Sequence, residues 1–170
     1  MRVIHPSAII SPHARIHATR LIVGKNSRID DGAVITGDVE IGDWVHIGAY
    51  VVITGRAGVK IGNYSAISMF CTILTGSDDF SGRSMAGPTI PVKYKPHLSA
   101  APVNIERNVL IGAHSTVMPG VTLREGVAIG AYSMVKADCD ENGIYSGIPA
   151  VFVKPRDLTM WDFVKELESE

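Results

Sequence analysis

The sequence has few cysteines, almost no net charge and no long apolar run, and each of these absences excludes a class of protein. Two cysteines in 170 residues supply neither a disulfide framework nor the spacing of a metal site. A count of 16 Lys and Arg against 17 Asp and Glu leaves a net charge of -1. No basic field is therefore expected to hold a nucleic-acid backbone, and nucleic acid is not an expected partner.

The apolar residues are equally informative. No stretch approaches the length of a membrane span, and residues 1–6 lack the charged start and apolar run of a secretory signal. We therefore expect a cytoplasmic protein with no membrane partner and with Cys71 and Cys139 as reduced thiols. The length and the 46% hydrophobic content fit one domain with a sizeable core.

What the sequence does contain is a repeat of six residues, in which an aliphatic residue recurs at every sixth position. Neither an α-helix nor a plain strand has this period. A second column of small or modest side chains, such as Ala33, Ser65 and Cys71, follows four residues later. Two inward positions in each repeat describe one face of a triangular coil. The aliphatic positions expected to point inward are Ile4, Ile10, Ile16, Ile22, Ile29, Ile35, Ile41, Ile47, Ile53, Ile61, Ile67, Ile73, Ile105, Ile111, Val117, Leu123, Ile129 and Val135.

Glycine directly follows the aliphatic residue in several repeats, as in Ile41-Gly42 and Ile111-Gly112, which fits corners where a Cβ would be crowded. Stacked coils would pair short strands in parallel around a continuous aliphatic column. This aliphatic-Gly-x-x-small-x pattern resembles the hexapeptide-repeat acyltransferase family over roughly residues 4–73 and 103–136. The resemblance implies an all-β fold, a left-handed parallel β-helix, assembled as a homotrimer.

Two segments break the repeat. Residues 74–102 are rich in glycine and proline, which predicts a long excursion loop between coils. In residues 156–170, Leu158, Trp161 and Val164 recur at roughly helical spacing, which predicts a C-terminal amphipathic helix. We expect one domain, with the β-helix over residues 1–155 and the helix of residues 156–170 packed on it.

Aromatic residues occupy outward positions three residues after the aliphatic ones. Trp44 would lie under Tyr64 and Tyr50 under Phe70, with Tyr132 further along, so the rings would form exposed stripes. Such stripes typically mark an interface. The alternative is that the excursion or the C-terminal helix covers them.

The start of the excursion is where the resemblance places a catalytic His. This sequence has Asp78 there, followed by Asp79. A carboxylate is a weak base unless burial or a second carboxylate raises its pKa, but an amine acceptor needs less help than a hydroxyl. The alternatives are that the pair only shapes a turn and that His97, on the same excursion, is the base.

The string Ser-Asp-Asp-Phe-Ser-Gly and the later Pro91-Val92-Lys93-Tyr94 resemble the dTDP-4-amino-4,6-dideoxyglucose acyltransferases. This resemblance implies transfer of an acetyl group from acetyl-CoA to the amino group of a nucleotide-linked deoxyamino sugar in surface-polysaccharide biosynthesis. O-acetylation of a sugar or antibiotic, and a non-catalytic assembly subunit, are the alternatives. A γ-class carbonic anhydrase would need three His ligands, and the His spacing does not supply them, so no metal is expected.

The resemblance also assigns residues to acetyl-CoA. Two small residues would contact it through the backbone, and a Gly-x-Pro-Ala turn followed by a lysine would meet its phosphates. Val151 departs from the Arg that such proteins sometimes carry. The alternative for Lys154 is that it is a solvated lysine at the entrance to the helix. The assigned residues are Ala113, Ala131, Lys136, Pro149 and Lys154.

Overall fold

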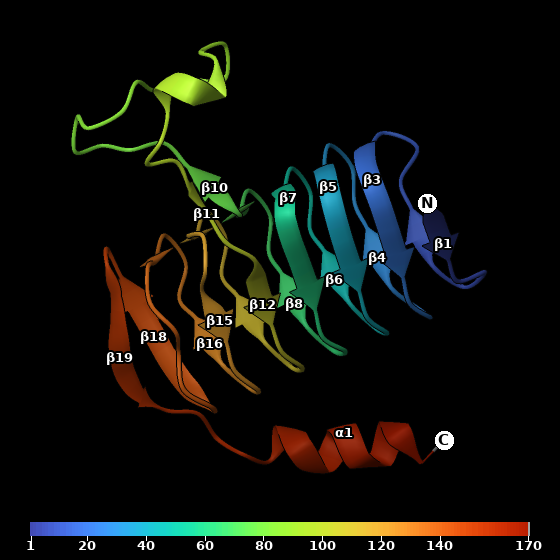
Figure 1. Cartoon of the computed structure of the whole chain (residues 1–170). Helices are drawn as coiled ribbons and strands as arrows, with labels where there is room; N and C mark the ends of the chain where they lie inside the picture. Colours follow the sequence, from blue (N-terminus) through green and yellow to red (C-terminus); the bar gives the residue numbers. More distant parts are fainter. Residues whose placement is uncertain (170) are drawn as a thin grey trace.

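The computed structural model describes residues 1–169 and shows a coil of short strands followed by one helix (Figure 1). The left-handed parallel β-helix expected from the repeat is confirmed. Its elements are β1 (Arg2–Ile4), β2 (Ile9–Ile10), β3 (Arg15–Val23), β4 (Arg28–Ile29), β5 (Val34–Ile41), β6 (His46–Ile47), β7 (Val52–Ile61), β8 (Ala66–Ile67), β9 (Thr72–Leu74), β10 (Gly76–Ser77), η1 (Val92–Tyr94), β11 (Ser99–Ala100), β12 (Val103–Ile105), β13 (Leu110–Ile111), β14 (Thr116–Val117), β15 (Thr122–Leu123), β16 (Ala128–Ile129), β17 (Met134–Val135), β18 (Gly143–Gly147), β19 (Ala150–Pro155) and α1 (Met160–Glu168).

The strands form the three sides of a triangular prism. Side 1 consists of β1, β12, β15 and the second halves of β3, β5 and β7. Side 2 consists of β2, β4, β6, β8, β13, β16 and β18. Side 3 consists of β9, β14, β17 and the first halves of β3, β5 and β7.

Parallel pairing stacks one inward aliphatic residue on the next. On side 2, the pairs Ile29↔Ile47, Ile47↔Ile67 and Ile111↔Ile129 follow the axis of the coil, and all of these side chains are buried. Burial of each such side chain contributes about 1.5–3 kcal/mol. The small column is buried too, and its Ser65 hydroxyl donates to the Glu106 carbonyl at 2.9 Å, so the polar atom is satisfied.

One of the predicted inward positions is wrong. Ile22 is half-buried, whereas Leu21 and Val23 on either side of it are fully buried. The register of β3 against β5 shifts between Ala18 and Arg20, and Val23, not Ile22, stacks on Ile41. An extra residue in a strand sends every later side chain to the opposite face, which explains the error.

Successive sides meet at corners. At corners 1 and 2, the third residue after the inward aliphatic residue has a positive φ in most coils. Corner 1, between sides 1 and 2, has Asn26, Trp44, Tyr64, Asn108, Gly126 and Asn142 in this conformation. Corner 2, between sides 2 and 3, has Gly32, Tyr50, Phe70, His114 and Tyr132. Gly and Asn adopt this conformation readily, and bulky side chains do not.

The excursion leaves the prism at corner 3, between sides 3 and 1. β10 and β11 pair antiparallel at its base, so its two ends are held together, and Val103 resumes the coil directly on Val59. The repeat extends slightly into the predicted loop, because Thr75 is fully buried and its hydroxyl donates to the Thr54 carbonyl at 2.5 Å.

The C-terminal part differs from the expected boundaries. Residues 143–155 form an antiparallel hairpin of β18 and β19, and only β18 continues the parallel stack on β16. The helix begins at Met160, not at residue 156, because the Asp157 carboxylate accepts from the Thr159 N–H at 2.8 Å and forms a turn first. Residue 170 of the predicted helix lies outside the described residues.

The helix α1 runs along corner 1, while Figure 1 shows the excursion on the opposite side of the coil. Trp161 donates to the Asn142 side chain at 2.8 Å and lies 4.9 Å from the Arg107 guanidinium. Glu168 lies 3.5 Å from Arg107 and neighbours Tyr64, which is half-buried. The alternative in which the helix covers an aromatic therefore holds for Tyr64. None of the helical segments in residues 1–169 combines the length and apolar character that crossing a membrane requires.

Candidate functional site

Asp78 stands at the base of the excursion, directly after β10. Its Oδ2 accepts a hydrogen bond from the Gly87 N–H at 2.9 Å, and its Oδ1 lies 3.8 Å from the Lys95 ammonium. Lys95 is buried and donates to the Gly87 carbonyl at 2.8 Å, so it fixes the loop across from Asp78. Asp78 is therefore a partly exposed carboxylate held in a fixed position.

A hollow of about 200 Å³ opens beside this carboxylate. Arg56 and Lys95 line it together with Asp78, so two cationic groups face one carboxylate and the hollow carries net positive charge at neutral pH. A positive hollow suits an anionic substrate, and the carboxylate within it can accept a proton. The full lining is Arg56, Gly76, Ser77, Asp78, Pro88, Lys95, Leu98 and Ala100.

Asp79 has a different environment although it is the next residue. Its carboxylate accepts from the Ser81 hydroxyl at 2.6 Å, the Ser81 N–H at 2.9 Å and the Arg83 N–H at 2.9 Å. The hydrogen bonds from Ser81, and then that from Arg83, hold the pKa of Asp79 below its ordinary value despite slight desolvation. This is the geometry of a turn former, and the pKa moves away from the value that a base needs. A catalytic role for Asp79 stays a prediction.

His97 is exposed on the excursion and does not line the hollow beside Asp78. Its backbone N–H donates to the Ser84 hydroxyl at 3.0 Å. Within one chain, Asp78 therefore lines this hollow and His97 does not, and the catalytic roles of both stay predictions.

Three of the five residues assigned to acetyl-CoA lie near the C-terminal end of corner 2. Ala113 and Ala131 occupy successive coils there, where the Tyr132 N–H donates to the Ala113 carbonyl at 2.9 Å. The hairpin tip that carries Pro149 reaches the same corner, because the Gly147 N–H donates to the Ser133 hydroxyl at 3.1 Å.

The two lysines do not join this group within one chain. Lys136 is exposed directly after β17, where side 3 ends. Lys154 is exposed on β19 opposite Ile144, at the far end of the hairpin from its tip. Contacts of either lysine with CoA remain predictions.

Corner 2 also carries a continuous stack of rings, which we call the aromatic ladder: Tyr50, Phe70, His114 and Tyr132. Neighbouring ring centroids are 5.2, 4.9 and 4.7 Å apart, and neighbouring planes are within 11° of parallel. The predicted stacking of Tyr50 on Phe70 is confirmed. Unlike Tyr64, the tyrosine and phenylalanine rungs remain exposed over about half of their surface or more in the single chain.

A cluster on side 2 near the N-terminus was not predicted. The Asp30 carboxylate contacts His46 Nε2 at 2.7 Å through one oxygen and Arg28 Nε at 2.5 Å through the other. Burial raises the pKa of Asp30, but the hydrogen bonds from His46 and Arg28 outweigh it, and the pKa lies below its ordinary value. The signal was present in the sequence, since the coil places Arg28 directly opposite His46.

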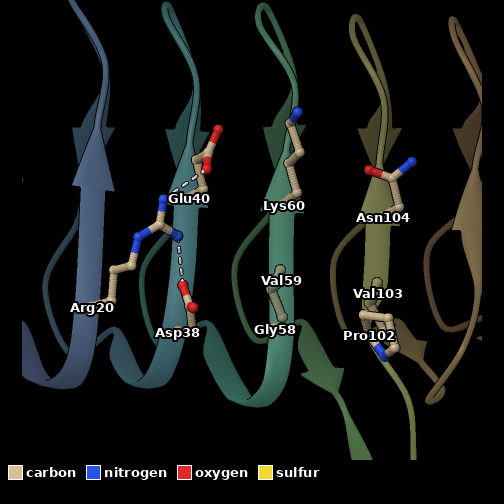
Figure 2. Close-up of a pocket in the computed structure, with 9 residues that line it drawn as sticks. All are labelled: Arg20, Asp38, Glu40, Gly58, Val59, Lys60, Pro102, Val103 and Asn104. Carbon is tan, nitrogen blue, oxygen red and sulfur yellow. Dashed lines mark hydrogen bonds and ion pairs between the residues drawn. The ribbon is translucent and has the colours of Figure 1, made fainter.

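Side 1 carries a second polar strip, which Figure 2 shows across neighbouring strands. Arg20 contacts Asp38 at 2.8 Å and Glu40 at 3.2 Å, and the hollow there has about 310 Å³. The hydrogen bonds to Asp38 and Glu40 raise the pKa of Arg20. Partly exposed ion pairs of this kind contribute little stability, and we assign the strip no catalytic role.

Metal ligands are not gathered anywhere in the part of the chain that the structure describes, residues 1–169: no three His, Cys, Asp or Glu side chains are placed to hold one ion. The two thiols, Cys71 and Cys139, are both buried.

Comparison with known proteins agrees with the architecture. Residues 21–55 and 102–137 match the bacterial transferase hexapeptide (six repeats) family. The chain is 39% identical over 150 residues to a dTDP-4-amino-4,6-dideoxy-D-glucose acyltransferase of Escherichia coli, covering 86% of this chain and 76% of that protein. It is 29% identical to a putative lipopolysaccharide biosynthesis O-acetyltransferase of Escherichia coli, over 74% of this chain and 66% of that protein.

Among solved structures, a variant of AntD, an N-acyltransferase from Bacillus cereus, superposes with a TM-score of 0.94 at 36% identity, covering 99% of this chain and 91% of that one. That variant was crystallised with dTDP-4-amino-4,6-dideoxyglucose and coenzyme A. Another structure of the same protein holds dTDP and 3-hydroxybutyryl-CoA.

Proposed function

The chain belongs to the hexapeptide-repeat family of CoA-dependent acyltransferases, and we propose that it transfers an acyl group to the amino group of a dTDP-linked deoxyamino sugar. The observation that carries the proposal is the fixed Asp78 carboxylate in a cationic hollow at the base of the excursion. The substrates of the relatives, a dTDP-linked amino sugar and an acyl-CoA, support it.

We propose Asp78 as the group that receives the proton. The neutral amine attacks the thioester carbonyl, the new N–C bond forms, and the C–S bond breaks to release the CoA thiolate. The proton lost by the nitrogen passes to Asp78 and then to the departing sulfur. A carboxylate suffices because a neutral amine attacks without prior deprotonation, so its proton leaves late.

A spacing in the relative supports Asp78 over Asp79. AntD has been crystallised with substitutions at one serine and at one aspartate ten positions later. In this chain Ser68 and Asp78 have that spacing, and no other serine precedes an aspartate by ten residues. We therefore include Ser68, which ends side 2 at corner 2, as a second residue of the site.

We propose a homotrimer that is joined along corner 2, because the aromatic ladder is an exposed apolar ridge there. Three triangular prisms that meet along one edge leave a wedge-shaped cleft between each pair. Side 2 of one copy and side 3 of the next bound this cleft, and the excursion at corner 3 leans over it. Ser68 of one copy and Asp78 of another would then face the same cleft.

The CoA residues are placed as a proposal as well. Ala113, Ala131 and Pro149 lie toward the C-terminal end of the coil from Asp78, so the pantetheine arm would descend along corner 2 to the amine. We favour acetyl-CoA as the donor, with 3-hydroxybutyryl-CoA as the alternative that AntD suggests.

We place the reaction in the cytoplasm, where the two unpaired thiols remain reduced. A role in the biosynthesis of surface polysaccharide, such as lipopolysaccharide, is supported by the names of more distant relatives.

The test is a panel of acceptors and donors followed by thiol release. The purified chain is incubated with acetyl-CoA or 3-hydroxybutyryl-CoA and with dTDP-linked 4-amino and 3-amino sugars, their 4-hydroxy counterparts, and the same amino sugars on UDP. We expect turnover with an amino sugar on dTDP and at least about a hundredfold lower kcat/KM for the hydroxy counterpart.

Turnover of the hydroxy sugar alone would contradict the proposal in favour of O-acetylation, the activity given for one relative. A lack of thiol release with every acceptor, in a protein that remains folded, would favour the assembly subunit.

A further inference from the structure

We infer that the nucleoside diphosphate part of the substrate binds on side 2, in the hollow between Arg28, Trp44 and His46, away from Asp78 toward the N-terminus. The inference rests on the proposed function and adds the nucleotide-binding residues to it. The hollow has about 380 Å³ and is lined by Asn26, Arg28, Asp30, Trp44, Val45 and His46.

The first argument is chemical complementarity. A thymidine diphosphate presents a flat base and two phosphate groups. Trp44 offers an indole that is 40% exposed, and Asn26 below it offers an amide that can both donate and accept. Base stacking on an aromatic ring contributes about 1–3 kcal/mol.

The second argument is the orientation of the cationic groups. Arg28 uses Nε for Asp30, and within residues 1–169 its two terminal nitrogens have no hydrogen-bond partner, so the planar fork is free to meet phosphate oxygens. His46 is held by the other oxygen of Asp30 through Nε2, and in the described part of the chain its Nδ1 has no hydrogen-bond partner. One carboxylate thus holds two side chains that both line the hollow.

The third argument is backbone strain. Trp44 has a φ of 57°, whereas the coil below has Asn26 at the equivalent position with a φ of 54°. A left-handed conformation suits asparagine and costs a bulky residue about 1–3 kcal/mol. Tyr64, at the same corner, is covered by α1, but Trp44 remains 40% exposed. A ligand that stacks on the indole accounts for an aromatic residue at this strained position.

A second hollow at the same height contains similar groups but offers no free ring. It is lined by His13, Arg15, Asp31, Gly32, Val34, Tyr50 and Val52. One face of Tyr50 stacks on Phe70, and Gly32 lies so close to the ring that an added Cβ would be 2.5 Å from it. Within residues 1–169, Trp44 has no stacked aromatic partner. The base therefore has a platform on side 2 and none on side 3.

The position along the coil agrees with the chemistry. β4 and β6 lie near the N-terminal end, the excursion leaves from the middle, and the hairpin tip lies at the C-terminal end (Figure 1). A nucleotide on β4 and β6 and a CoA on the last coils would approach Asp78 from opposite directions. In the proposed trimer, side 2 of one copy faces the excursion of the next, so the sugar would extend from Arg28 of one copy toward Asp78 of another.

The experiment measures binding of dTDP by calorimetry and steady-state kinetics for wild type, Trp44→Asn and Arg28→Gln. Trp44→Asn keeps a residue that suits the backbone, so its Tm should equal or exceed that of wild type. We expect each variant to bind dTDP at least about tenfold more weakly and to have a higher KM for the sugar nucleotide. The KM for acyl-CoA should stay within about twofold of the wild-type value.

Arg124→Gln is the matched control, because Arg124 also pairs with an aspartate, Asp140, but on the last coils. It should bind dTDP as wild type does. If wild type binds dTDP and turns over its amino sugar while Trp44→Asn and Arg28→Gln bind dTDP equally well, the nucleotide site is overturned and the function stands. If wild type neither binds dTDP nor uses a dTDP-linked amino sugar, the proposed function fails and the inference fails with it.

Discussion

Asp78 and Asp79 illustrate how far the surroundings of two identical neighbouring side chains can differ. Asp79 accepts three hydrogen bonds from residues within its own turn, so its carboxylate is occupied. Asp78 accepts one from Gly87 and faces a hollow with Arg56 and Lys95. Asp78 therefore keeps more lone pairs available to a substrate than Asp79 does, and it presents them to a hollow.

We expect Asp78→Asn to lower kcat about 10²–10⁴-fold, since an amide cannot accept the proton. Asp79→Asn should lower kcat/KM by less than about fivefold and act through loop order instead. Parallel kinetics with thermal denaturation distinguish the two effects. Full kcat/KM in Asp78→Asn would remove Asp78 from the mechanism and make His97 the next candidate.

The thiols predict a second outcome. Burial raises the pKa of Cys139 to about 11, helped by Asp138 and Asp140, and burial likewise raises the pKa of Cys71. The thiolate is the reactive form. At pH ~8 we expect Ellman's reagent to label neither cysteine in the native protein and to label both in guanidinium chloride. Rapid labelling of the native protein would contradict the burial of these side chains.

Asp30 predicts how stability changes with pH. Its pKa is lowered on folding, so its contribution is complete above the pKa of an unfolded aspartate, about 3.9, and is lost as the pH falls through the lower folded value. The Tm difference between wild type and Asp30→Asn should therefore be largest near pH ~7 and shrink toward pH ~3. A difference that is independent of pH would mean that the His46 and Arg28 contacts do not stabilise the fold.

At the scale of the structural elements, we expect the aromatic residues at the corners to favour assembly at the expense of the stability of the single chain. Tyr132 combines a φ of 56° with 66% exposure and has one stacked neighbour, His114. Tyr132→Asn relieves backbone strain and removes ring stacking, and these two changes alter the free energy of unfolding by about 1 kcal/mol each in opposite directions. We expect a similar Tm but a weaker trimer, measured by light scattering over a dilution series.

Phe163→Asn is the matched control, because Phe163 is also 66% exposed but lies on α1. It should leave the trimer unchanged. Equal dissociation of both variants would mean that the aromatic ladder is not the interface.

Most of the elements could be predicted because the repeat reports burial directly. The period fails at Leu21, Ile22 and Val23, where three aliphatic residues compete for the inward positions and only pairing with β5 decides. The β18–β19 hairpin was missed because its pairing is a contact that no local pattern reveals, and the start of α1 was missed because the turn at Asp157 and Thr159 precedes the helix.

The candidate site was less accessible to sequence reasoning. Asp78 was identified by its position in the excursion, but Arg56 and Lys95 reach it only because β10 and β11 close the loop at corner 3. The Arg28, Asp30 and His46 cluster requires the register of β4 on β6, which places residues of successive coils side by side.

The assembled molecule predicts that two copies share each site. If the cleft joins Arg28 of one copy and Asp78 of the next, chains carrying Asp78→Asn and chains carrying Arg28→Gln should complement each other. Random mixing would restore both residues in about a quarter of the clefts. We expect co-refolded mixtures to exceed the mean of the two separate proteins when assayed below KM for the sugar nucleotide.

Mixtures of Asp78→Asn with Asp78→Ala serve as the control and should show no gain. If the complementary pair shows no gain either, although mixed trimers form, each site belongs to a single chain.

The short clasp of β10 and β11 gives the excursion a modular character. Gly76 pairs with Ala100, and the coil resumes with Val103 on Val59. The structure of the prism therefore does not depend on how many residues lie between the two strands of the clasp. Closure entropy grows only slowly with the length of a loop. Relatives could therefore exchange this segment as a cassette, and a chimera that carries a foreign cassette should retain the scaffold while changing which acceptor it modifies.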